Sequence, residues 1–138
     1  MRVHVLDANA LYRFLTGGPG ADTVNRLFKE ARDADQPLRM SVVNWGEVYY
    51  TIAKAEGFSE TARIMRRVQL LPLAVFDVGE LVTAKAAQLK AGHGLPYADC
   101  FAAAITRKED VLVTSDMKDF KKIPGLRILA LPEHKTKN

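Results

Sequence analysis

The sequence predicts an α/β protein, a three-layer α/β/α sandwich with a mostly parallel central sheet. Short segments rich in Val and Leu alternate with longer segments that have helical spacing of apolar residues. Short apolar strands separated by helices are typical of a parallel sheet that is covered on both faces. No Pro- or Ser-rich linker divides the 138 residues. We therefore expect a single domain over residues 1–132, followed by a polar tail over residues 133–138.

The first quarter of the chain predicts one strand and two helices. Residues 2–6 read RVHVL, and their alternating β-branched side chains predict a strand. A helix follows over residues 8–15, and the Gly- and Pro-rich segment 16–20 ends it. A second helix is expected over residues 23–34, with Asp22 as its N-cap.

The next segment predicts a strand and two more helices. Residues 38–43 read LRMSVV and predict the second strand. Asn44 is expected to cap a helix over residues 45–56, and Ser59 to cap the helix after it. The first of these helices has apolar residues at helical spacing, namely Trp45, Val48, Tyr49 and Ile52.

The second half of the chain continues the alternation. Strands are expected over residues 71–76, 111–114 and 127–131, and a helix over residues 77–91. Pro96 suits the first turn of a further helix. From Ala98 to Ile105 that helix is apolar except for Asp99. A buried carboxylate is rare without a partner, so Asp99 indicates that other groups meet it in the fold.

Composition excludes several classes of protein. Apolar residues make up 48% of the chain and charged residues 26%, as in ordinary globular proteins. The single cysteine, Cys100, cannot form an intramolecular disulfide, and we expect it to pack in the core of a cytoplasmic protein. No apolar run is long enough to cross a bilayer, so no membrane partner is expected. The net charge of +4 allows a polyanionic partner such as nucleic acid without requiring one.

Four acidic residues follow predicted strands or begin predicted helices. Asp7 comes directly after the first strand, and Asp116 comes after the strand that ends at Thr114. Glu47 and Asp99 lie in the first turns of predicted helices. Because ligands bind beyond the carboxyl ends of parallel strands, we expect these four carboxylates to meet at one edge of the sheet.

Each acid also has a simpler structural interpretation. Asp7 and Asp116 can cap the helices that follow them, and Asp99 suits a helix dipole. Glu47 lies three residues after Asn44, which is the spacing of a capping box. Capping alone does not explain why one acid interrupts an apolar helix while others gather at strand ends, so together the four favour a site.

The residue types favour a hard divalent cation. The three histidines are scattered along the chain and there is no cysteine cluster, so a zinc site is not expected. Oxygen ligands alone suit Mg²⁺ or Mn²⁺. Such an ion lowers the pKa of its bound water and neutralises charge on a phosphoryl oxygen, which is the chemistry of phosphodiester hydrolysis.

The chain resembles the PIN domain family and, within it, the VapC-type toxin ribonucleases. The matching segments are VLDANAL, SVVNWGEV, GLPYADCFAAA and LVTSDMKDFKKIPGL. The resemblance implies a Mg²⁺- or Mn²⁺-dependent endoribonuclease that forms a homodimer and is silenced by a cognate antitoxin protein. It implies that the acids which bind the metal and catalyse cleavage of RNA are Asp7, Glu47, Asp99 and Asp116. Asn9 and Thr114 would support them.

The segment after the fourth predicted strand departs from the family pattern. A second acid, Asp119, lies three residues after Asp116, so either of them can complete the site. We favour Asp116 because it directly follows the strand. Lysines beside it can attract phosphates or simply form a solvated turn, and they are Lys118, Lys121 and Lys122.

Three other functions remain open from the sequence. A phosphatase of the haloacid dehalogenase type would have two aspartates where this chain has Asp7 and Asn9. A receiver domain would have paired acids after the first strand and a lysine after the last, and only Asp77 favours it. A catalytically idle PIN-like module that binds RNA or protein is the third, and the four acids argue against it.

Overall fold

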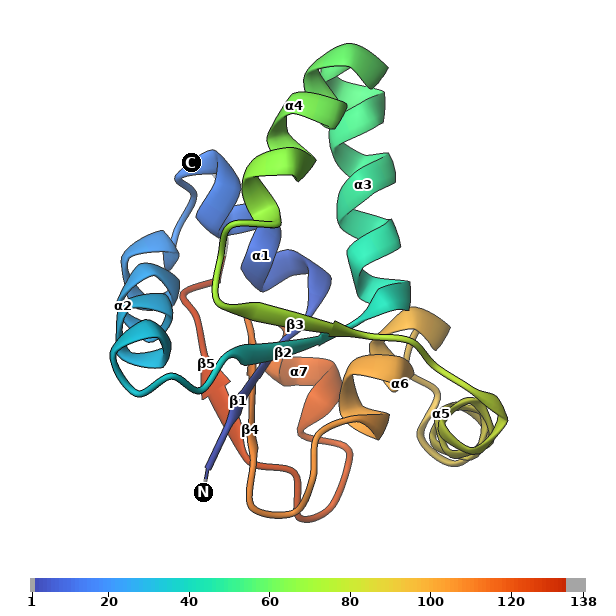
Figure 1. The fold of residues 1–138 in the computed structure, drawn as a ribbon. Coiled ribbons are helices and arrows are strands. Elements are labelled where there is room, and N and C mark those ends of the chain that lie inside the picture. Colours follow the sequence, from blue (N-terminus) through green and yellow to red (C-terminus); the bar gives the residue numbers. More distant parts are fainter. Residues whose placement is uncertain (1, 134–138) are drawn as a thin grey trace, which may run out of the picture.

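The computed structural model describes residues 2–133 and contains a central sheet of five strands (Figure 1). Their order is β3-β2-β1-β4-β5, and every neighbouring pair is parallel. The strands are β1 (His4–Leu6), β2 (Leu38–Ser41), β3 (Leu73–Phe76), β4 (Val111–Thr114) and β5 (Ile128–Ala130). Because all five run in the same direction, their carboxyl ends share one edge of the sheet. The predicted parallel sheet is confirmed.

Helices cover both faces of this sheet, which confirms the predicted sandwich (Figure 1). One face carries α1 (Ala8–Thr16), α2 (Ala21–Asp33), α3 (Val42–Glu56) and α4 (Phe58–Val68). The other carries α5 (Glu80–His93), α6 (Tyr97–Ala104) and α7 (Met117–Phe120). Within residues 2–133, none of these helices has the length and apolar character that crossing a membrane requires.

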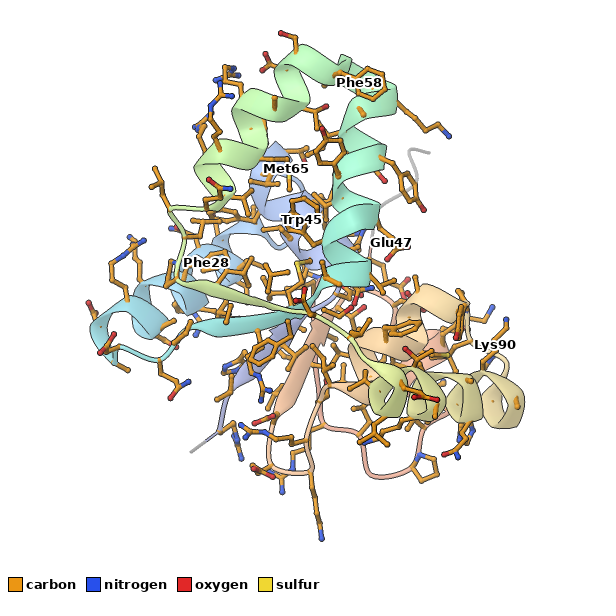
Figure 2. The ribbon with its side chains drawn as sticks, turned by 45° about the vertical axis from the view of Figure 1, so that its right-hand side comes forward. Phe28, Trp45, Glu47, Phe58, Met65 and Lys90 are labelled. Carbon is orange, nitrogen blue, oxygen red and sulfur yellow. The ribbon has the colours of Figure 1, made fainter. Side chains whose placement is uncertain are left out.

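Two apolar cores lie on opposite sides of the sheet. Leu6 faces the core beneath α1 to α4, where Phe28 and Met65 are also buried (Figure 2). The preceding residue, Val5, faces the core beneath α5 to α7, where the predicted core residue Cys100 is buried. Neighbouring strand residues point to opposite faces, so a strand covered on both sides needs consecutive apolar residues. This requirement explains the Val- and Leu-rich strands.

Two of the predicted helix caps are wrong because glycine begins the helix instead. The N-cap of α2 is Gly20 and that of α4 is Gly57, and neither offers a side chain for capping. Asp22 and Ser59 lie in the first turns of these helices rather than before them. Asp22 can still interact favourably with the positive end of its helix.

The start of α3 is the third correction. The Ser41 hydroxyl accepts hydrogen bonds from the backbone N–H groups of Val43 at 3.0 Å and Asn44 at 3.4 Å, so Ser41 is the N-cap. The second strand therefore ends at Ser41 rather than at residue 43, and Asn44 lies inside the helix. Glu47 is consequently in the second turn of α3, and its interpretation as part of a capping box is wrong.

The last described residues pack against the turn between α1 and α2. The Arg13 guanidinium donates hydrogen bonds to the carbonyl oxygens of Pro19, at 3.1 Å, and Pro132. Gly20 has a φ of +90°, and a Cβ atom there would lie 3.1 Å from Cβ of Leu131. Beyond Glu133, the predicted polar tail lies outside the described residues.

Candidate functional site

A cavity of about 420 Å³ opens at the carboxyl ends of β1 and β4. The four acids predicted from strand ends and helix starts all line it, although they come from four separate parts of the chain. Its polar lining consists of Asp7, Asn9, Tyr12, Glu47, Thr51, Asp99, Ser115 and Asp116. The structure thus brings the predicted acids together at the expected edge of the sheet.

Asp7 is the most buried of these acids, with 3% of its surface exposed. It is the N-cap of α1, as predicted, and its carboxylate accepts a hydrogen bond of 2.8 Å from the backbone N–H of Ala10. Burial raises the pKa of Asp7 to about 6 against the opposing effect of hydrogen bonds from Thr114 and Ala10, and the charges of Glu47 and Asp116 raise it further. A helix cap alone does not require this burial among other acids.

Asp99 lies in the first turn of α6, as predicted, and points its carboxylate toward the other acids. Burial raises the pKa of Asp99 to about 7. Repulsion adds to the effect of burial, in decreasing order, from Asp7, Glu47, Asp116 and Asp119. The single acid in an apolar helix therefore faces four others, of which, among the described residues, only Asp119 forms an ion pair, with Lys122.

Thr114 connects Asp7 to Asp116. Its hydroxyl is fully buried, donates to the Asp7 carboxylate, and accepts a hydrogen bond of 2.9 Å from the backbone N–H of Asp116. The predicted supporting residue therefore lies between two of the four acids.

Both acids after β4 come close to Asp99. Asp116 caps α7 and accepts a hydrogen bond of 3.1 Å from the backbone N–H of Asp119. One oxygen atom from each of Asp99, Asp116 and Asp119 lies within 4.8 Å of the other two. Burial raises the pKa of Asp116, which also lines the cavity. Asp116 and Asp119 therefore both lie near Asp99, and the presence of one does not exclude the other.

Glu47 reaches the cavity from the part of α3 that lies next to α6 (Figure 2). The side-chain amide of Asn44 donates hydrogen bonds to Oε1 of Glu47 at 3.0 Å and to the carbonyl oxygen of Ala98 at 3.0 Å. Asn44, which the sequence predicts to be a helix cap, instead makes these contacts from inside the helix. Only the spacing of three residues between Asn44 and Glu47, one helical turn, could have indicated the contact with Glu47.

Asn9 and Ser115 form a second polar contact across the cavity. The Ser115 hydroxyl donates a hydrogen bond to Oδ1 of Asn9, which connects α1 to the segment after β4. Ser115 and Tyr12 were not predicted as site residues. The signal for Tyr12 was its position three residues after Asn9, because residues at that spacing share a helix face.

The donor set fits a hard divalent cation. All four acids offer carboxylate oxygens, and the described histidines, His4 and His93, do not line the cavity. Carboxylates that raise one another's pKa lose this repulsion when a cation neutralises them. Oxygen ligands of this kind are those that Mg²⁺ and Mn²⁺ prefer.

Solved structures of similar fold cover nearly the whole chain. The DNA-bound VapBC complex from Salmonella typhimurium contains a chain of 19% identity and TM-score 0.76, and the match covers 94% of this chain and 98% of that one. VapBC2 from Rickettsia felis, bound to a promoter DNA fragment, contains a chain of 18% identity and TM-score 0.74, and the match covers 93% of this chain and 98% of that one. VapBC-1 from nontypeable Haemophilus influenzae contains a chain of 18% identity and TM-score 0.67, and the match covers 93% of this chain and 97% of that one. These matches establish similarity of fold.

Sequence comparison assigns the family. A search of curated proteins finds no match. A family model described as PIN domain matches residues 4–126. This range includes the first four strands and every acid that lines the cavity. The chain belongs to the PIN domain family.

Proposed function

We propose that this protein is a Mg²⁺- or Mn²⁺-dependent endoribonuclease and the toxin of a VapBC-type toxin–antitoxin pair. The observation that carries the proposal is the meeting of Asp7, Glu47, Asp99 and Asp116 in one cavity. Membership of the PIN domain family and the VapBC complexes among the similar structures support it. Such a density of carboxylates destabilises an apo fold, which is expected where a cation is part of the working protein.

The four acids would hold the ion, with Asp119 beside them. A bound Mg²⁺ or Mn²⁺ supplies charge neutralisation at a phosphoryl oxygen and a water of lowered pKa. Asp7 is fixed by the N–H of Ala10 and the hydroxyl of Thr114, and Glu47 by the amide of Asn44. Fixed carboxylates of this kind hold an ion and its ligands without reorganising during the reaction.

Two further features suit an RNA substrate. The net charge of +4 favours association with a polyanion, although the cavity itself is acidic. Lys118 is exposed beside Asp116, where its charge can attract the phosphate backbone to the acidic cavity. Lys122 instead forms an ion pair of 3.3 Å with Asp119, so it belongs to the charged turn.

The proposed partners are a cognate antitoxin and a second copy of this chain. Similar structures include toxin–antitoxin complexes, one of them from Klebsiella pneumoniae, in which the matched chain is covered over 95% of its length. This chain therefore spans nearly the full length of one chain in each of those complexes. An antitoxin that closes the acidic cavity would have to present a cation or a basic side chain to it.

Cleavage of a long RNA tests the proposed function. We expect the parent chain to cut the RNA in Mg²⁺ or Mn²⁺ and to leave it intact in EDTA. Asp99→Asn removes one charge at constant size and should abolish cleavage without loss of folding. Binding of RNA with no cleavage in any divalent cation would contradict the proposal and favour the idle PIN-like module.

A further inference from the structure

Asn44 is a buried polar side chain between the two helices that carry Glu47 and Asp99. No part of its surface is exposed. Its Nδ2 atom donates to Oε1 of Glu47, on α3, and to the carbonyl oxygen of Ala98, on α6, both at 3.0 Å. Ala98 directly precedes Asp99, so one amide group contacts both site-bearing segments.

The orientation of this amide is determined by its neighbours. The Glu47 carboxylate and the Ala98 carbonyl are both acceptors, so only the NH₂ group of Asn44 can face them. The amide oxygen then points away and is buried without a hydrogen-bond partner. A buried acceptor without a partner destabilises the folded state. An apolar side chain of similar size would avoid this cost but would remove both hydrogen bonds donated by Nδ2, so the asparagine is explained by its contacts with Glu47 and Ala98.

We propose that Asn44 is a positioning residue for the acidic cavity. It holds the Glu47 carboxylate toward the other acids and joins α3 to α6, which sets the placement of Glu47 relative to Asp99. The inference rests on the proposed function, because it assigns Asn44 a part in the binding of the cation that the cavity is proposed to hold. Groups that orient the ligands of a metal typically change its affinity 10- to 100-fold when they are removed.

Ser41 provides the matched control. It caps the same helix, three residues earlier, and its hydroxyl accepts from the backbone N–H groups of Val43 and Asn44. None of these bonds involves the Asn44 side chain or Glu47. Ser41→Ala therefore weakens the start of α3 while leaving the contact between Asn44 and Glu47 in place.

The test compares the parent chain with Asn44→Leu, Asn44→Ala, Glu47→Gln, Ser41→Ala and the double variant Asn44→Leu/Glu47→Gln. Mn²⁺ affinity is measured by isothermal titration calorimetry on chains that circular dichroism shows to be folded. RNA cleavage is measured in parallel, with kcat and KM determined separately. Asn44→Ala keeps the test available if the larger leucine is not accommodated.

We expect both Asn44 variants to bind Mn²⁺ about tenfold more weakly than the parent and to lower kcat more than they change KM. Glu47→Gln should weaken Mn²⁺ binding as well, and the double variant should be no weaker than Glu47→Gln alone, because Asn44 acts through Glu47. Ser41→Ala should lower the melting temperature but keep the affinity of the parent.

Three results would overturn the inference and leave the proposed function standing: affinity equal to the parent in the Asn44 variants, effects that multiply in the double variant, or equal loss of affinity in Ser41→Ala. Affinity equal to the parent in Glu47→Gln would also overturn it, because Glu47 would then have no part in binding. A parent chain that binds no Mn²⁺ would overturn both the inference and the proposed function.

Discussion

Asp99 carries its charge among four other carboxylates, on a helix that is otherwise apolar from Ala98 to Ile105. Burial and this repulsion raise its pKa from 3.8 to about 7. A carboxyl whose pKa is raised by folding binds more protons in the folded chain than in the unfolded chain between these two values. The free energy of unfolding of the metal-free protein therefore falls as the pH rises from about 4 to about 7.

Asp99→Asn should remove this part of the pH dependence. At pH 8 in EDTA we expect the variant to be more stable than the parent by on the order of 1–3 kcal/mol, less than the whole shift implies because the carboxyl is partly exposed. If Asp99 only interacted with the helix dipole, Asp99→Asn would instead lower the free energy of unfolding by about 0.3–1 kcal/mol. Urea unfolding of both chains at pH 4.5 and pH 8 distinguishes these opposite signs.

Asp116 and Asp119 should differ in importance for cleavage. Asp116 lines the cavity and caps α7, and asparagine caps a helix equally well, so Asp116→Asn should fold normally. We expect it to lower the rate of RNA cleavage by about 100-fold or more. Asp119→Asn removes the ion pair with Lys122 and should lower the cleavage rate by only about tenfold.

Single-turnover cleavage rates at saturating Mg²⁺ measure this difference. Equal losses in the two variants would mean that the three closely spaced carboxylates act as one unit. A larger loss in Asp119→Asn would assign the site to that residue instead.

At the level of single residues, the sequence predicted the positions of the acids well, because local pattern determines where strands end and helices begin. Asp7, Asp99 and Asp116 each lie at such a point. The role of Asn44 could not be predicted, because its second partner, Ala98, is 54 residues away in the chain. Contacts of that kind depend on how two helices pack.

Among the elements, the junction of β2 and α3 shows why boundaries were harder to predict. Val42 and Val43 are β-branched and favour a strand, so the sequence predicted a strand to residue 43. In the structure Ser41 caps the helix, and Val43 packs against the core beneath α5 to α7. Capping and burial together outweigh the small local preference of two valines.

The turn between α1 and α2 gives a test at the same scale. Gly17 and Gly20 both have positive φ angles, which cost any other residue roughly 1–2 kcal/mol. Around Gly17 there is open space, whereas a Cβ on Gly20 would press on Leu131 and Pro132. We expect Gly20→Ala to lower the free energy of unfolding by about 1–3 kcal/mol more than Gly17→Ala does.

Urea unfolding of the two variants measures this difference, with Gly17→Ala as the matched control for backbone conformation. An equal decrease in the free energy of unfolding in the two variants would show that the segment after β5 shifts to accommodate the added methyl group. In that case the packing of residues 131–132 against α2 would contribute little to stability.

Over the whole molecule, a cation that binds the proposed site would stabilise the fold, because the acids of the cavity come together only in the folded chain. We expect Mg²⁺ or Mn²⁺ to raise the melting temperature by several degrees, corresponding to about 2.7 kcal/mol at an ion concentration 100 times the Kd. Asp99→Asn should abolish most of this rise. Differential scanning calorimetry with Mg²⁺ and with Na⁺ at matched ionic strength checks it, and an unchanged response in the variant would place the ion elsewhere.

The alternation of strands and helices was sufficient to predict a parallel sheet with helices on both faces. It did not predict the order of the strands, which places β1 between β2 and β4. That order follows from which strands pair across long stretches of chain, and residue patterns within a strand carry little information about it.

The central place of β1 has a consequence for the synthesis of this protein. The backbone N–H of Val3 bonds to Asp110, 107 residues later, and β1 then pairs with β4. A growing chain that has reached residue 110 already contains Asp7, Glu47 and Asp99, but it lacks both β4 and Asp116. The pairing of β1 with β4 can therefore form only after nearly the whole chain has been synthesised. The cavity is therefore incomplete in the nascent chain on the ribosome. Any activity that depends on the complete cavity begins only after β4 and Asp116 have emerged.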